Sequence, residues 1–426
     1  MSKPLRLGLT GPFGSGSSTI REILGKAPFN FKTYCLSDIV KDTWSKWNGR
    51  DAKEATRKEL QNTGNKLRKD HNDAAILARK TLELADKESQ DKSLIFDSIR
   101  NVAEVEYFRQ RFYDFYLIGV CCSESFRWER VRKDQYERFG LRYSDFKTDE
   151  ERDQNEEGVF FGQQVALCMH EADLLIVNEN QPMRDDRISV ENILREKLQD
   201  YAGLFDGNLR PPFDHESFMS IAYDASLMSR CFKRQVGAVI VDENGTVISI
   251  GYNANPKTMK PCYEEFGDCY RWVHIDRQIG ELTSCPFCGT KFDKTLAYPY
   301  RCPKCDKDIY RSMVRDRAMS KCTALHAEEM AIINAANRNL GGHSIYATTF
   351  PCFTCAQKIL QTGIKNITYV ESYPDLDSIA LFRKAAETRE VLLRKFEGVK
   401  ARAYHRLFGP WRKHMEDEIS KKRMSS

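Results

Sequence analysis

The segments LHAEEMA (residues 325–331) and FPCFTCAQ (residues 350–357) decide what the C-terminal half of this sequence can form. Each reads as a junction that leads into a helix. In chain order they offer one imidazole and two thiols: His326, Cys352 and Cys355. This set predicts a zinc site with three protein ligands and one open tetrahedral position. The alternative is a closed structural zinc site with a fourth ligand elsewhere.

Glu328 follows the predicted histidine ligand by two residues. An open zinc site generates hydroxide near pH 7, and a neighbouring carboxylate can carry the protons. His-x-Glu followed by Pro-Cys-x-x-Cys is typical of zinc nucleobase deaminases, in which the glutamate is an acid/base and not a ligand. We therefore predict that Glu328 is the catalytic proton shuttle.

The C-terminal half resembles the deoxycytidylate deaminase branch of the cytidine deaminase superfamily. The resemblance covers most of residues 219–380 apart from an insert. Four segments carry it: SRCFKRQVGAVIV (229–241), SIGYNANP (249–256), LHAEEMAI (325–332) and PCFTCAQKILQTGIKNITYVESYPD (351–375). The apolar runs and helical segments of this half themselves predict a β-β-α-β-α-β order on a mixed sheet.

The same resemblance implies roles for further residues. Asn253 would hold the sugar hydroxyl and the ring, and Tyr373 would line the nucleotide pocket. The substrate phosphates would face Ser229, Arg230 and Arg234. Two alternatives stay open: Asn253 as a turn residue before a proline, and the two arginines as a solvated helix end.

The insert contains Cys-x-x-Cys twice, in CPFCG (285–289) and CPKCD (302–306). Four thiolates predict a closed, structural zinc site formed by Cys285, Cys288, Cys302 and Cys305. The spacing of Cys262, Cys269, His274 and Cys322 does not require a further metal. The insert could contact nucleic acid, contact another subunit or gate the substrate.

The segment GLTGPFGSGSSTI (residues 8–20) matches the phosphate-binding loop pattern except that Ser17 stands where lysine is expected. Backbone N–H groups and a helix N-terminus bind phosphate without lysine, but phosphoryl transfer depends on it. We expect the loop to bind a nucleoside triphosphate with Mg²⁺ but not to transfer its phosphoryl group. The loop residues concerned are Gly11, Gly14, Gly16, Ser17, Ser18 and Thr19. A purely structural turn is the alternative.

Two other features are consistent with descent from nucleoside monophosphate kinases. Asp97 ends the apolar strand SLIFD, where an acid linked to Mg²⁺ would lie. The segment ESFRWERVRKD (124–134) resembles a lid whose arginines could contact phosphates: Arg127, Arg130 and Arg132.

The predicted fold class is α/β with two domains. Residues 1–205 alternate strands and helices as in a kinase-like parallel sheet. Turn residues make 206–215 the linker. Residues 216–426 form a cytidine-deaminase-like α/β/α domain with a zinc-ribbon insert at 280–312.

Composition restricts the class of protein. The 426 residues include 14 cysteines, and the N-terminus lacks the features of a signal peptide, so we expect a reducing, cytoplasmic location. No apolar run approaches the ~20 residues of a membrane span. The net charge is +5, and basic residues gather in 379–426, which we interpret as a solvated helix face or a surface facing phosphates.

The two-domain layout resembles bacterial anti-phage deoxycytidine nucleotide deaminases. This implies hydrolysis of dCTP or dCMP to the deoxyuridine nucleotide and ammonia, depletion of dCTP during infection, a homo-oligomer, and control by a small RNA or a phage-derived trigger. One alternative is a deaminase of RNA or single-stranded DNA, with RAYHRLFGPW (402–411) as a stacking surface. Another is a nucleotide sensor without deaminase activity.

Overall fold

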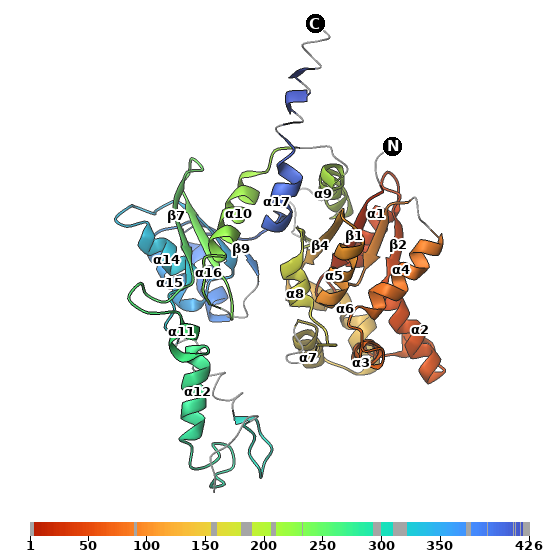
Figure 1. Cartoon of the computed structure of the whole chain (residues 1–426), viewed down its shortest axis with the longest axis horizontal. Coiled ribbons are helices and arrows are strands. Elements are labelled where there is room, and N and C mark those ends of the chain that lie inside the picture. The colour runs from red at the N-terminus through yellow and green to blue at the C-terminus, as the bar shows by residue number, and fades with distance from the viewer. Residues whose placement is uncertain are drawn as a thin grey trace. The chain divides into compact units, whose positions relative to one another are not determined.

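The computed structural model contains two compact units (Figure 1), formed by Met1–Ser217 with Phe396–Ser426 and by Phe218–Lys395. The structure describes residues 4–88, 92–154, 160–179, 190–205, 210–231, 233–292, 300–309, 322–371, 376–389 and 391–411, with isolated positions up to 420. Among these residues, no helix is long and apolar enough to cross a membrane.

The first unit is built on a six-stranded sheet in the order β11-β5-β4-β1-β3-β2. Five strands are parallel: β1 (Arg6–Thr10), β2 (Lys32–Cys35), β3 (Leu94–Asp97), β4 (Phe115–Cys121) and β5 (Leu174–Val177). Every residue of β3 and β4 is buried, as expected for strands covered by helices on both faces. This confirms the predicted parallel α/β unit.

The first unit also contains most of the helices. The α-helices are α1 (Ser17–Gly25), α2 (Leu36–Asn48), α3 (Arg57–Asp70), α4 (Ile76–Glu88), α5 (Val102–Arg111), α6 (Glu124–Val131), α7 (Tyr143–Gln154), α8 (Val165–Glu171), α9 (Val190–Phe205) and α17 (Ala401–Phe408). Three short turns of helix, η1 (Ala52–Glu54), η2 (Arg132–Tyr136) and η3 (Glu137–Phe139), complete it. Apolar residues of β1, β4, β5, α1, α9 and α17 share one core.

The C-terminal end of the chain returns to the first unit. Strand β11 (Gly398–Val399) pairs antiparallel with β5. The buried Lys400 side chain donates to the carbonyls of Met169 (3.1 Å) and His170 (2.6 Å) at the end of α8. The sequence assigned residues 216–426 to one domain, and the structure differs because β11 and α17 complete the sheet and core of the first unit.

A buried carboxylate holds together the segments that lead out of and back into the first unit. Glu216 accepts hydrogen bonds from Arg210 (2.8 Å) and from the Val399 N–H (2.9 Å). Helix α10 (Asp214–Ser226) begins here and continues into the second unit. Residues 206–209 of the predicted linker lie outside the described residues.

The second unit contains a five-stranded mixed sheet in the order β10-β9-β8-β6-β7. Its strands are β6 (Gly237–Val241), β7 (Val247–Tyr252), β8 (Ser344–Thr349), β9 (Asn366–Glu371) and β10 (Leu392–Lys395). The pairs β6/β7 and β6/β8 are antiparallel, whereas β8/β9 and β9/β10 are parallel. The expected mixed sheet is therefore present, with β10 as an additional strand.

The helices of the second unit are α11 (Cys262–Phe266), α12 (Tyr270–Gly280), α14 (Ala327–Asn334), α15 (Phe353–Gln361) and α16 (Leu376–Arg389). Helix α14 packs closely on β7, where Gly251 leaves no room for a side chain. A Cβ atom at Gly251 would lie 2.2 Å from the Ala327 carbonyl oxygen and 2.3 Å from the Ala331 nitrogen. This close contact fixes the height of α14 above the sheet.

Candidate active site

The structure brings His326, Cys352 and Cys355 together. The imidazole Nδ1 of His326 lies 3.2 Å from the Cys352 Sγ and 3.3 Å from the Cys355 Sγ. All three potential ligand atoms lie within 4.8 Å of one another. This spacing suits atoms that share one metal ion.

Two helix starts create this meeting point. His326 immediately precedes α14, and Cys352 immediately precedes α15. Strand β8 ends at Thr349, so Cys352 lies just beyond the C-terminal end of this strand. Cys355 lies three residues further, on the same face of α15. The two helices contact each other, and this contact brings His326 close to the two cysteines.

Glu328 lies next to these residues with a side chain almost sealed from solvent. Its relative exposure is 3%, and burial raises the pKa of its carboxyl above the ordinary value. The contact with Cys355 lowers the pKa of the Cys352 thiol to about 4. The site therefore combines a thiol that ionises readily with a carboxyl that takes up a proton readily.

The donor set fits zinc. Imidazole and thiolate are its usual ligands, and three of them match a site that keeps one position for water or substrate. Among the described residues, no fourth histidine, cysteine, aspartate or glutamate belongs to the group. A proton-carrying carboxyl beside an open zinc site is the arrangement used in hydrolytic chemistry.

Comparison with known proteins agrees with this geometry. A sequence model described as "Cytidine and deoxycytidylate deaminase zinc-binding region" matches residues 212–371. The deoxycytidylate deaminase of Enterobacteria phage T2 is 33% identical over 162 residues, which cover 36% of this chain and 78% of the phage protein. The chain belongs to the deoxycytidylate deaminase family.

Other members of the deoxycytidylate deaminase family show the extent of the match. The Homo sapiens deoxycytidylate deaminase is 30% identical, with 42% of this chain and 78% of the human protein covered. The Schizosaccharomyces pombe enzyme is 33% identical, with 49% of each chain covered. The chain thus spans about half the length of this yeast relative. A model of an AAA domain matches residues 7–156.

The side chain of Asn253, predicted to contact substrate, bonds to the protein backbone. Its Oδ1 accepts the Val236 N–H (2.8 Å), and its Nδ2 donates to the Arg234 carbonyl (2.8 Å). The Ser229 hydroxyl donates to the Asn253 carbonyl at 2.7 Å. Asn253 therefore shapes the segment that precedes β6, and its contact with a sugar stays a prediction.

The two predicted phosphate-binding arginines lie beside carboxylates. Arg234 pairs with Glu371 at the end of β9 (2.6 Å), and Arg230, which is 68% exposed, lies 3.5 Å from Glu264. Tyr373 lies outside the described residues. The described predicted substrate residues of this deaminase family member thus come from the end of β7 and from the segment before β6.

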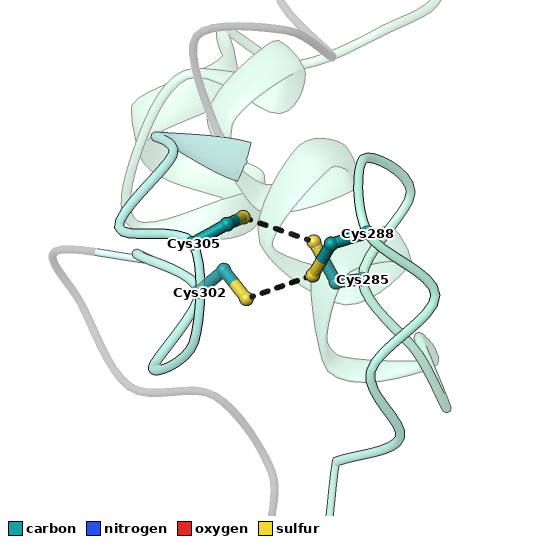
Figure 2. Close-up of side chains that lie close together, drawn as sticks. All are labelled: Cys285, Cys288, Cys302 and Cys305. Atoms are coloured by element: carbon teal, nitrogen blue, oxygen red, sulfur yellow. Dashed lines mark hydrogen bonds between the residues drawn. The ribbon is translucent and has the colours of Figure 1, made fainter.

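The insert brings its four cysteines together on two facing loops (Figure 2). The Sγ atoms of Cys285 and Cys305 lie 3.8 Å apart, and those of Cys288 and Cys302 lie 3.7 Å apart. Zinc–sulfur bonds of about 2.3 Å in a tetrahedron require sulfur–sulfur distances of about 3.8 Å. The residues therefore fit a zinc ion with no open position. A small core that includes Ile279 and Ile309 surrounds them.

A further group of candidate ligands was left open by the sequence. Cys262 lies near Asn255 Nδ2 (3.5 Å) and Thr323 Oγ1 (3.7 Å). In the described part of the chain, two groups have the spacing of metal ligands, and neither contains Cys262, Cys269, His274 or Cys322.

The glycine loop of the first unit joins β1 to α1. Gly14 (φ 80°) and Gly16 (φ 89°) both adopt the left-handed conformation, in which glycine is favoured. Asn178, the residue after β5, donates to the Ser15 carbonyl at 2.9 Å. Asp97 is buried, and Ser17 donates a hydrogen bond to its carboxylate. The sequence did not point to Asn178, although the parallel sheet places the ends of β1, β3 and β5 along one edge.

The predicted lid arginines are used by the protein itself. Arg127 donates to the Phe13 carbonyl (3.2 Å) and Arg130 to the Ser15 carbonyl (3.1 Å), so both contact the loop backbone. Arg132 pairs with Glu129 at 3.1 Å. Arg127 and Arg130 thus stabilise the loop in this structure, and a contact of the three arginines with phosphates stays a prediction.

Proposed function

We propose that this member of the deoxycytidylate deaminase family is a zinc-dependent hydrolytic deaminase of free deoxycytidine nucleotides, dCTP or dCMP. The products would be the deoxyuridine nucleotide and ammonia. The observation that carries the proposal is the approach of His326 Nδ1 to both cysteine sulfurs, with the buried Glu328 alongside.

The chain's own residues have clear parts in this reaction. His326, Cys352 and Cys355 would hold the zinc, which supplies a hydroxide nucleophile at neutral pH. Glu328 would take one proton from the attacking water and deliver it to the ring nitrogen. It would then carry the second proton, from the added hydroxyl group, to the amine that leaves as ammonia. Its burial supports this role, because a carboxyl in an apolar setting exchanges protons nearer to neutral pH.

The remaining predicted residues would bind the nucleotide. Ser229, Arg230 and Arg234 would face the phosphate end and Tyr373 would line the pocket, while Asn253 would hold the sugar and ring. The high exposure of Arg230 supports a role in contacting a charged ligand from solvent. The proposed structural zinc of the insert would be held by its four cysteines and would take no part in the chemistry.

The first unit is proposed to bind a nucleoside triphosphate with Mg²⁺ as a regulatory ligand. In the described residues, the N–H groups of Gly14, Gly16, Ser17 and Ser18 have no hydrogen-bond acceptor in the protein. Amide groups at a helix start bind phosphate oxygens well. The absence of the loop lysine argues against phosphoryl transfer.

The wider role follows from the layout of the chain. We propose that it acts in the cytoplasm as a homo-oligomer, depletes dCTP in anti-phage defence, and responds to a regulatory RNA or a phage-derived trigger. The support is the combination of a phosphate-loop unit with a deaminase unit, each of which matches a family model.

Deamination of a polynucleotide has less support. Of the segment RAYHRLFGPW, Arg402 pairs with Glu171 (2.5 Å), and the Arg406 guanidinium lies 4.0 Å from the centre of the Tyr116 ring. These arginines are engaged by the first unit and are less available to nucleic acid.

Ammonia release from dCMP, dCTP, CTP, cytidine and a cytosine oligonucleotide tests the proposal. We expect turnover of dCTP or dCMP by the parent protein. Glu328→Ala should retain zinc and lose at least about 10²-fold in rate, because it lacks the proton shuttle. Glu387→Ala, an exposed carboxylate on α16, is the control. Turnover of the oligonucleotide alone, or a fully active Glu328→Ala variant, would contradict the proposal.

A further inference from the structure

One ion pair joins α14 to α15 about one helical turn beyond the proposed zinc ligands. Lys358 of α15 donates to Glu329 of α14. Glu329 follows His326 by three residues, and Lys358 follows Cys355 by three residues. Because residues three apart lie on the same face of a helix, the ion pair lies directly behind the contact between His326 and Cys355.

Glu329 has a second contact, with the start of its own helix. Its Oε2 accepts the N–H of His326 at 3.5 Å, while its Oε1 accepts from Lys358. An acidic side chain in the first turn also suits the positive end of the helix dipole. One carboxylate therefore contacts both the backbone of the histidine ligand and the helix that carries the cysteines.

The buried residues of these two helices are mostly small. The buried residues of α14 are Ala327, Glu328 and Ala331, and those of α15 are Cys355, Ala356 and Ile359. Alanine side chains allow close approach but form shallow ridges, so they limit sliding and rotation only weakly. The ion pair between Glu329 and Lys358 adds a polar restraint on the spacing of the two helices.

We propose that Glu329 and Lys358 are positioning residues, which hold α14 and α15 at the spacing that lets His326 and Cys355 share one zinc ion. The inference rests on the proposed zinc site. Residues that orient metal ligands without touching the metal typically change its affinity by about 10–100-fold.

The ion pair is too exposed to stabilise the fold strongly. The side chain of Lys358 is 40% exposed and that of Glu329 is 23% exposed, and such pairs contribute little to folding. A positioning role therefore predicts a change in zinc retention with a nearly constant thermal midpoint. A merely structural role predicts a lower thermal midpoint with unchanged zinc retention.

The test compares Lys358→Met, Glu329→Gln and the double variant, with Lys365→Met, an exposed lysine of the same unit, as control. A chelating dye records the rate at which zinc leaves each protein. The phase due to the active site is the one that a Cys355→Ser variant lacks. We expect that phase to be about tenfold faster in each single variant than in the parent. The double variant should release zinc no faster than either single variant, because the two residues act as one unit.

Two further measurements sharpen the result. Lys358→Arg keeps the charge, so its active-site zinc should leave at the rate seen in the parent. The phase in which zinc leaves the insert should stay unchanged in every variant. Parent-like release from both single variants, or rates that multiply in the double variant, would overturn the inference while leaving the proposed function standing. If the parent and Cys355→Ser show the same phases of zinc release, both the zinc site and the proposed function fail.

Discussion

At the scale of single residues, the glycine loop shows how backbone conformation and close contact act together. Gly16 has a φ of 89°, and its Cα lies against Asn178, where an added Cβ would be 2.1 Å from the amide nitrogen. Arg130 donates both to the Ser15 carbonyl and to the Asn178 carbonyl, so it fixes the same contact. The loop is therefore held in one conformation by the strand end opposite it.

Gly16→Ala should destabilise the first unit more than an ordinary left-handed glycine would. The conformation itself costs about 1–2 kcal/mol for alanine, and the clash with Asn178 adds about 1–3 kcal/mol. Gly49→Ala is the matched control, because Gly49 also has a positive φ (65°) but has nothing within 4 Å of its Cβ position. Urea unfolding measures both variants. Equal losses would show that the loop relaxes away from Asn178.

At the scale of elements, the zinc proposed for the insert should matter more to its folding than its small apolar core. Among the described residues, the buried members of this core are Ile279, Cys285, Cys302 and Ile309, against which Leu282, Phe292 and Tyr300 are partly buried. A core of this size is too small to offset the chain entropy of folding. The proposed zinc would therefore supply most of the free energy that folds the insert.

Cys302→Ser should release one zinc per chain and unfold the ribbon alone. We expect the amides of residues 285–292 and 300–309 to lose protection from hydrogen exchange, while α14 and α15 keep theirs and the proposed active-site zinc stays bound. Mass spectrometry of peptides and metal analysis measure both effects. Lys304→Ala, which changes an exposed side chain of the loop that carries Cys302 and Cys305, is the control. Retained protection in Cys302→Ser would contradict a metal-dependent fold.

The contribution of the C-terminal end of α8 to stability depends on the charge of Glu171. Hydrogen bonding from His170, the nearby Arg402 and contacts with Arg109 lower the pKa of Glu171 to about 2. A carboxyl with a depressed folded-state pKa stabilises the protein fully above its ordinary pKa of about 4.3 and loses that contribution as the pH falls toward 2.

Glu171→Gln should therefore lower the free energy of unfolding of the first unit by about 1–2 kcal/mol at pH 7, after allowance for partial exposure. The difference from the parent should shrink as the pH falls from 5 to 2. Urea unfolding at several pH values measures it. Glu191→Gln, at an exposed i,i+4 pair with Arg195, should change little at any pH. A constant difference across this range would show that Glu171 acts by packing and not by charge.

At the scale of the whole molecule, the deaminase unit is an insertion into the first unit. The chain leaves the first unit after Ser217 and returns to it at Phe396. After the return, Val399, Ala403, Leu407 and Phe408 are buried in the core of the first unit. The C-terminal segment is therefore part of the fold that contains the glycine loop.

Deletion of residues 396–426 should destabilise the first unit and spare the second. Loss of these buried side chains removes on the order of 5 kcal/mol, which corresponds to a fall of about 10–20 °C in the unfolding midpoint of that unit. Calorimetry should show one transition shifted and the other retained, with zinc still bound. Deletion of 412–426, which leaves β11 and α17 intact, is the control. A shift of the second transition alone would contradict this division.

The sequence by itself determined which residues gather in the two cysteine-containing groups and the class of both units. His326, Glu328, Cys352 and Cys355 lie at short, fixed spacings, and the ligand chemistry of imidazole and thiolate restricts what such spacings can bind. Long apolar strands such as FYLIGVC likewise predict a buried parallel sheet from local pattern alone.

Only the tertiary structure decided which distant segments meet. Strands β10 and β11 are four and two residues long, too short for an apolar pattern to reveal them, and their pairing depends on the sheet edges already formed. The contacts of Asn178 with the glycine loop and of Lys358 with Glu329 also join segments far apart in the chain. Such contacts form only when packing brings two surfaces together, so neither segment encodes them alone.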